Sequence, residues 1–188
     1  MNRTKRRIFN TAIKLFSEKG YESTSIEEIT AVAGVAKGSL YYHFPTKEDV
    51  FDFLLDDASK LLSNSIEIKF RHCNNALDKL KAIILVQIKS IIKYEEFVTV
   101  VMSETLGETE RSKKCQKVLF EYISKMEEVI REGIKEGIFY EGNAENLAFG
   151  IFGVTFSSLL FRLKKNRKVD AKEIYDEYID TVIRAMSI

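Results

Sequence analysis

The sequence is poor in helix-breaking residues, with one proline and nine glycines among 188 residues. Because proline and glycine interrupt helices most strongly, their scarcity predicts long uninterrupted helices. The contents of 45% hydrophobic and 30% charged residues provide material for a buried core and argue against disorder. We therefore expect an all-α fold.

Cysteine is also scarce, and Cys73 and Cys115 do not have the close spacing of a zinc site. The first 30 residues contain no apolar signal core. Both observations favour free thiols in the cytoplasm. His72 precedes Cys73, but no cluster of thiols or carboxylates completes a metal site there, so we expect neither a metal nor a cofactor.

The sequence lacks an apolar run long enough to span a bilayer. Its longest apolar stretch, residues 147–161, has 15 residues and contains three hydroxyl-bearing side chains, whereas a spanning helix needs about 20 residues. We expect a buried helix there and no membrane partner. The sequence also has no glycine-rich phosphate loop, nucleophile motif or acid–base pair around a histidine, so an enzyme is not expected.

Charge is unevenly distributed although the net charge is only +1. Residues 1–47 contain eight Lys and Arg and four Glu, a net charge of +4, and the remaining 141 residues contain 21 basic and 24 acidic residues, a net charge of −3. A positive end on a faintly acidic body suits a DNA-binding head.

Residues 24–47, TSIEEITAVAGVAKGSLYYHFPTK, form the most informative segment. Ser25 and Glu28 have the spacing of a capping box at the start of a short helix, and Gly34 can end that helix in the left-handed conformation. A second helix is predicted over 37–43. Two such helices joined by a tight turn form a helix-turn-helix, whose second helix normally enters the DNA major groove.

Helical spacing divides the second helix into an inner and an outer face. Leu40 and Phe44 should point into the domain. The middle of the outer face, which would meet base edges, contains Gly38, Ser39 and Tyr42. Its flanks, which would meet phosphates, contain Lys37, Tyr41 and His43. The complete set of residues predicted to bind DNA is Thr24, Ser25, Lys37, Gly38, Ser39, Tyr41, Tyr42, His43 and Lys47. The alternative is a small helical hairpin with solvated polar residues.

This segment resembles the TetR family of bacterial transcriptional regulators over about the first quarter of the chain. The matching positions are Gly20-Tyr21, Thr24-Ser25-Ile26, Ile29, Ala33-Gly34-Val35, Gly38, Leu40-Tyr41, His43-Phe44 and Lys47. Thr30 departs from the pattern, because the family usually has alanine there. Beyond Val50 the resemblance consists of length and helical character.

The resemblance implies two domains. Residues 1–46 would form a three-helix DNA-binding domain, and residues 47–188 a helical domain for effector binding and dimerisation that begins with a linking helix over 47–70. The other helices are predicted over residues 3–19, 77–93, 95–106, 112–136, 144–164 and 171–186.

The predicted helix over 144–164 carries apolar groups nearly all round, and the predicted helix over 171–186 carries them at four-residue steps. This pattern favours a four-helix bundle with a second copy of the chain. The predicted dimer interface consists of Phe149, Gly150, Gly153, Phe156, Ser157, Leu160, Tyr175, Tyr178, Ile179, Val182 and Ile183. A dimer also suits a short recognition helix, because two heads can read a palindrome. The alternative is a pair of core helices within a monomer.

The resemblance also implies a function: a ligand-responsive regulator, a repressor, that binds a palindromic double-stranded DNA operator as a homodimer and is released by a small-molecule effector. The effector pocket would lie among the helices of residues 77–136, lined by Gln87, Tyr94, Phe97, Met102, Glu104, Tyr122 and Met126. Each of these is alternatively an ordinary core or surface residue. The alternative function is a helical small-molecule-binding or adaptor protein of the same fold without DNA-binding activity.

Overall fold

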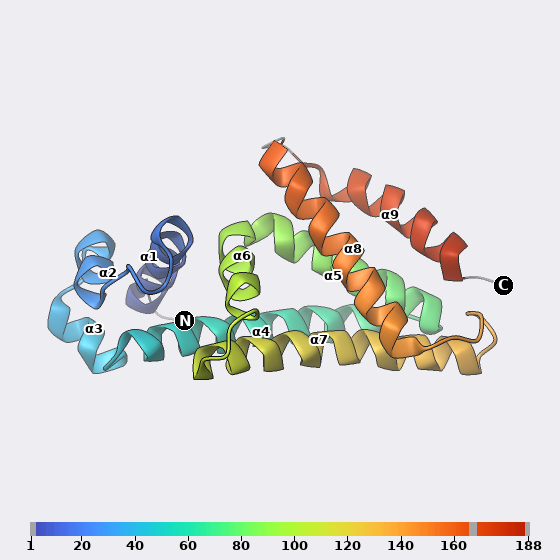
Figure 1. Cartoon of the computed structure of the whole chain (residues 1–188), viewed down its shortest axis with the longest axis horizontal. Coiled ribbons are helices and arrows are strands. Elements are labelled where there is room, and N and C mark those ends of the chain that lie inside the picture. Colours follow the sequence, from blue (N-terminus) through green and yellow to red (C-terminus); the bar gives the residue numbers. More distant parts are fainter. Residues whose placement is uncertain (1–2, 166–168, 187–188) are drawn as a thin grey trace. The chain divides into compact units, whose positions relative to one another are not determined.

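The computed structural model describes residues 3–165 and 169–186, and this part of the chain forms nine α-helices and no strand (Figure 1). The helices are α1 (Arg3–Lys19), α2 (Ile26–Ala33), α3 (Lys37–His43), α4 (Lys47–Phe70), α5 (Ala76–Lys93), α6 (Glu95–Glu104), α7 (Glu110–Lys135), α8 (Ala144–Lys165) and α9 (Ala171–Met186). The all-α prediction is confirmed, and every predicted helix begins and ends within two residues of its observed bounds.

The helix ends follow from local hydrogen bonds. At the start of α4, the Thr46 Oγ1 accepts from the Asp49 N–H at 3.1 Å and the Asp49 carboxylate accepts from the Thr46 N–H at 2.9 Å. This reciprocal pair is a capping box, with an aspartate in place of the usual glutamate. The isoleucine-rich helix α5 begins in a similar way, because the Asn75 side chain accepts from the Asp78 N–H at 2.9 Å.

The chain divides into two compact units. Unit 1 contains Met1–Lys60 and Glu96–Lys117, and unit 2 contains Leu61–Glu95 and Val118–Ile188. Unit 1 therefore combines α1 to α3 and the first part of α4 with nearly all of α6 and the first two turns of α7. The functional boundary expected between residues 46 and 47 stays a prediction.

The core of unit 1 is built around an aromatic cluster. Phe16, Tyr21 and Phe51 are all buried, with ring centroids 5.1 to 6.0 Å apart. Their edge-to-face and tilted arrangements are those that aromatic rings prefer. Phe16 is on α1, Tyr21 is on the following turn and Phe51 is on α4. This cluster therefore joins α1, the turn that precedes α2, and α4 through their side chains.

In unit 2, α5 packs against both α8 and α9. Half of the residues of α5 are buried, and α8 contributes a buried stripe formed by Ala144, Ala148, Ile151, Thr155, Leu159 and Leu163. The other face of α8 is open in the single chain, and the side chains of Val154 and Phe161 are 59% and 73% exposed. A single copy of the chain thus leaves one apolar face of α8 uncovered.

Candidate nucleic-acid interface

Both ends of α2 are held by caps, and the second cap lies at the corner between α2 and α3. The Ser25 hydroxyl accepts from the Glu28 N–H at 3.1 Å, as predicted, and the Glu28 carboxylate pairs with Lys19. Gly34 adopts the left-handed conformation, with φ of 57°. A side chain is strained in this conformation, so glycine is favoured here and the chain can turn directly into α3.

The two faces of α3 are confirmed by burial. Leu40 is fully buried and Phe44 is buried, whereas Tyr42 is 84% exposed. A Cβ atom at Gly38 would meet no other atom within 4 Å, so this position is open to an approaching molecule. Ser39 lies beside it and is partly exposed. The outer face of α3 thus presents a large aromatic ring next to a site without a side chain.

The predicted phosphate-contacting residues flank this face. Lys37 is exposed and its Nζ pairs with the Glu27 carboxylate of α2 at 2.9 Å. The Tyr41 hydroxyl donates to the same carboxylate at 3.1 Å. The ring of His43 is partly exposed and lies 5.1 Å from that of Tyr42 in an edge-on arrangement. The structure therefore brings the predicted residues of α3 to one surface.

Thr24 differs from the other predicted DNA-binding residues because its side chain is buried. Its hydroxyl donates to the carbonyl oxygens of Gly20 at 2.9 Å and Leu15 at 3.3 Å. These bonds satisfy carbonyl groups at the end of α1. The hydroxyl thus stabilises the turn between α1 and α2 and is turned away from solvent.

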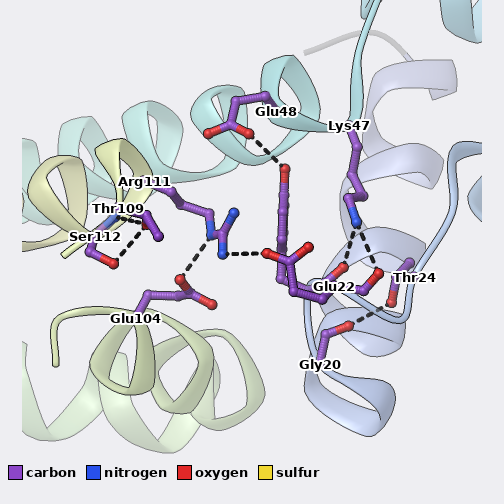
Figure 2. A network of polar contacts seen from close by, with 10 residues as sticks. Gly20, Glu22, Thr24, Lys47, Glu48, Glu104, Thr109, Arg111 and Ser112 are labelled. Carbon is purple, nitrogen blue, oxygen red and sulfur yellow. Dashed lines mark hydrogen bonds and ion pairs between the residues drawn. The ribbon is translucent and has the colours of Figure 1, made fainter. Parts of the chain in front are cut away.

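Lys47 also has hydrogen-bond partners within unit 1. Its Nζ donates to the carbonyl oxygens of Tyr21 at 2.8 Å and Glu22 at 3.2 Å, and lies 4.3 Å from the centroid of the Tyr21 ring (Figure 2). An ammonium group has three donors, and these two bonds use two of them. Lys47 therefore ties the start of α4 to the turn that precedes α2, and its contact with DNA stays a prediction.

The same turn is held from its other side by Arg111 of α7 (Figure 2). The Arg111 guanidinium pairs with Glu22 at 2.9 Å and with Glu104 of α6 at 2.8 Å, and it stacks 3.7 Å from the centroid of the Tyr21 ring. The Tyr21 hydroxyl donates to Glu48 at 3.0 Å, and burial, together with this bond, raises the pKa of Tyr21. The role of Arg111 is not predicted from the sequence, because its partner Glu22 is 89 residues away along the chain.

Unit 2 contains three buried polar side chains, which we call the interior cluster although only the first two are in contact: Gln87 of α5, Tyr122 of α7 and Thr155 of α8. All three are buried. The Gln87 Nε2 donates to the Phe152 carbonyl oxygen at 3.1 Å, and the Tyr122 hydroxyl lies 3.4 Å from the Gln87 Oε1. Burial raises the pKa of Tyr122. The Thr155 hydroxyl is buried without a hydrogen-bond partner.

The predicted pocket residues do not all belong to one unit. Gln87, Tyr94, Tyr122 and Met126 are in unit 2, whereas Phe97, Met102 and Glu104 are in unit 1. The Glu104 carboxylate is already paired with Arg111. The structure thus brings Gln87 and Tyr122 together and gives Glu104 a role in unit 1.

The predicted interface residues of α8 lie opposite its buried stripe. Phe149, Gly150 and Ser157 are exposed, and Gly153, Phe156 and Leu160 are partly exposed. On α9, the side chains of Tyr175, Tyr178, Ile179 and Val182 are partly exposed, and the side chain of Ile183 lies outside the described residues. The described side chains and glycines of this set are therefore at least partly open to solvent on the single chain.

The described residues also bear on a metal site and on a membrane-spanning helix. Among them, no group of three or more His, Cys, Asp or Glu side chains could hold a metal ion. By length and composition, α8 is the one helix in the described part of the chain that could cross a membrane, and core helices of soluble proteins share this composition. In the single chain α8 packs on α5, and 28% of the candidate span is buried, less than for the buried helix expected from the sequence.

Known proteins match nearly all of this chain. The family model for bacterial regulatory proteins of the tetR family matches residues 8–53, and the model for the tetracyclin repressor-like C-terminal domain matches residues 73–186. The fatty acid metabolism regulator protein of Bacillus subtilis (strain 168) is 24% identical over 179 residues, which cover 94% of this chain and 92% of that protein.

Two further comparisons cover different shares of the chain. The biofilm operon icaADBC HTH-type negative transcriptional regulator IcaR of Staphylococcus aureus is 36% identical over 76 residues, which cover 40% of this chain and 41% of IcaR. The solved structure of a Clostridium perfringens regulator named for fatty acid metabolism has a TM-score of 0.88 and 27% identity, covering 97% of this chain and 99% of that one. These three relatives are transcriptional regulators and not enzymes.

Proposed function

The chain belongs to the TetR family of DNA-binding transcriptional regulators, and we propose that it is a cytoplasmic repressor that binds a palindromic operator as a homodimer. The observation that carries the DNA-binding part is the orientation of α3, which buries Leu40 and Phe44 and exposes Tyr42 between flanking Lys37 and His43. Aromatic and basic groups arranged in this way suit a major groove and its phosphates.

The homodimer is supported by the open face of α8. Gly150 and Gly153 lie along this face, and a Cβ atom at either position would meet no other atom within 4 Å. Small residues let a second helix approach closely, and the flanking Phe149 and Phe156 would supply apolar area on each side. Two heads related by a two-fold axis would then read two half-sites.

For the effector we propose a fatty acid or a thioester of one, an apolar chain with a single polar end. Two of the similar proteins are named for fatty acid metabolism. The interior cluster supplies a matching polar group within apolar surroundings, because the buried Thr155 hydroxyl is without a partner and Gln87 and Tyr122 lie in the same unit. A buried unpaired hydroxyl is costly, and a ligand oxygen could satisfy it.

The operator is tested by enriching bound duplexes from a random DNA library and measuring binding by fluorescence anisotropy over a salt series. We expect selection of a palindrome, bound more tightly than a scrambled duplex, with a steep salt dependence from phosphate contacts. Equal and weak binding to all duplexes would instead favour a helical protein of this fold that does not bind DNA.

The effector is tested by adding fatty acids of increasing chain length and their thioesters to the complex of protein and operator, with chain-matched alkyl trimethylammonium ions as the control. We expect release by the acids or thioesters alone.

Replacing Tyr42 by alanine is expected to weaken operator binding by about 1–3 kcal/mol while leaving binding to scrambled DNA unchanged. Because the Tyr42 side chain is 84% exposed, its removal should not disturb the fold. The two affinities are measured by anisotropy, with Leu106→Ala, which removes another exposed side chain from unit 1, as the control. An unchanged preference for the operator would show that Tyr42 does not read bases.

Replacing Thr155 by valine is expected to stabilise the free protein by about 1–2 kcal/mol, since a methyl group replaces an unpaired buried hydroxyl. The same variant should need about tenfold more fatty acid to leave the operator, because a hydrogen bond to the effector is lost. Urea denaturation and effector titration measure the two effects. Thr181→Val is the control, because that hydroxyl is exposed and donates to Glu177 at 3.1 Å. Higher stability with an unchanged effector response would place the effector elsewhere.

A further inference from the structure

The exposed surface of the helix-turn-helix contains an acidic residue that the predicted DNA contacts did not include. Glu27 lies in the first turn of α2, and its side chain is 57% exposed. Its Oε1 is 2.9 Å from the Lys37 Nζ and accepts from the Tyr41 hydroxyl at 3.1 Å. The Lys37 Nζ also lies 5.7 Å from the centroid of the Tyr41 ring. These three side chains, the Glu27 cluster, join α2 to the recognition helix α3.

A carboxylate at this place opposes the attraction between the head and DNA phosphates. The bonds from Lys37 and from Tyr41, with a backbone hydrogen bond, lower the pKa of Glu27 to about 2, so it is charged near neutral pH. While Lys37 is paired with Glu27, its positive charge is cancelled locally. Since attraction to phosphates supplies most of the affinity for non-specific DNA, the Glu27 cluster weakens that affinity.

The same carboxylate also orders the side chains that meet the operator. Lysine has a long flexible side chain, and holding it in one conformation before binding reduces the entropy lost on binding. The Tyr41 ring is held by the same oxygen. In a major groove, a carboxylate can accept hydrogen bonds from base amino groups, whereas phosphates repel it. Its interaction with DNA is therefore favourable only where the base sequence supplies such donors.

We propose that Glu27 is a specificity-determining residue that holds Lys37 and Tyr41 in place for the operator and penalises binding to other DNA. Its neighbour Glu28 provides a matched comparison, because it is also in the first turn of α2 but its carboxylate pairs with Lys19 of α1. A general effect of negative charge on this helix would be shared by both residues. An effect that depends on the contacts to α3 belongs to Glu27 alone.

The test compares the unmodified protein with Glu27→Gln, Glu27→Asp and Glu28→Gln, each measured by anisotropy on the selected operator and a scrambled duplex over a salt series. For Glu27→Gln we expect three- to tenfold tighter binding to scrambled DNA and about a tenfold smaller ratio of operator to scrambled affinity. The salt slope on scrambled DNA should steepen by about one released ion as Lys37 becomes available to a phosphate. Glu27→Asp keeps the charge and should retain the weak binding to scrambled DNA.

Two results would overturn the proposal: an unchanged affinity ratio in Glu27→Gln, or an equal change in Glu28→Gln. The proposal depends on operator binding by the regulator, and the unmodified protein in the same assay tests that separately. If it shows no preference for the operator, the proposed function fails. If it keeps its preference and Glu27→Gln does too, the role of Glu27 alone fails.

Discussion

Replacing Arg111 by alanine is expected to lower the free energy of unfolding by about 2–4 kcal/mol. The guanidinium is buried between the carboxylates of Glu22 and Glu104 and stacks on the Tyr21 ring. The Glu104 side chain is only 18% exposed, so its charge would be left partly buried without its partner. The 78% exposure of the Glu22 side chain means that its pair with Arg111 contributes less, because water screens it.

The matched control is Lys113→Ala, two residues along α7. Its ion pair with Glu110 is exposed on both sides, so we expect a change below about 1 kcal/mol. Urea denaturation followed by circular dichroism measures both variants, at several protein concentrations because dimerisation adds to apparent stability. Equal losses in the two variants would mean that the Arg111 network contributes no more than an exposed ion pair.

Arg111→Lys separates charge from geometry at the same position. Lysine keeps the positive charge, but it lacks the planar fork that donates to two carboxylates at once and stacks on a ring. We expect the lysine variant to recover less than half of the lost stability. Because Arg111 and Lys47 hold opposite sides of the turn that precedes α2, both Arg111 variants should also bind the operator less tightly.

The helices could be predicted because their signals are local. Ser25 and Thr46 cap within three residues of themselves, and the two faces of α3 follow from a period of 3.6 residues. Thr24 shows the limit of such signals. The side chain of a threonine before a helix can donate to a nearby carbonyl oxygen or face solvent. The position of α1 decides that the Thr24 hydroxyl donates to the carbonyl oxygens of Leu15 and Gly20.

The contacts that join distant segments could not be predicted from periodicity. Arg111 has no local feature that points to Glu22, and Glu104 reads equally well as a pocket residue or as an ion-pair partner. Gln87 and Tyr122 were predicted as pocket residues by resemblance, whereas the unpaired hydroxyl of Thr155 becomes visible only in the packed interior. Whether a buried polar group has a hydrogen-bond partner depends on the folded structure, so it cannot be predicted from the spacing of residues in the sequence.

Replacing Gly153 by arginine is expected to convert the proposed dimer into a monomer and to weaken operator binding by about a hundredfold or more, since two linked heads bind far more tightly than one. Gly153 lies on the face of α8 opposite the buried stripe, and a Cβ atom there would meet no other atom of the chain within 4 Å. The single chain therefore has room for the arginine. A partner helix packed closely on this face would not, and it would bury the charge.

Sedimentation equilibrium measures the dimer, and anisotropy on the selected operator measures DNA binding. Asn64→Arg, an arginine at an exposed site of α4, is the control and should remain a dimer. Thermal unfolding at low protein concentration tests whether the fold is kept. Arginine has a higher helix propensity than glycine by up to about 1 kcal/mol, so the monomeric variant should be no less stable than the monomer of the unmodified protein.

The result decides between two accounts of the apolar surface of α8. Exposed aromatic and aliphatic groups such as Phe149, Val154 and Phe161 are costly in a monomer unless another molecule covers them. If the Gly153 variant is a folded monomer that binds one half-site weakly, a second copy of the chain covers this face. If the variant is an intact dimer with normal operator affinity, the two copies meet through another surface, and the open face of α8 serves a different partner.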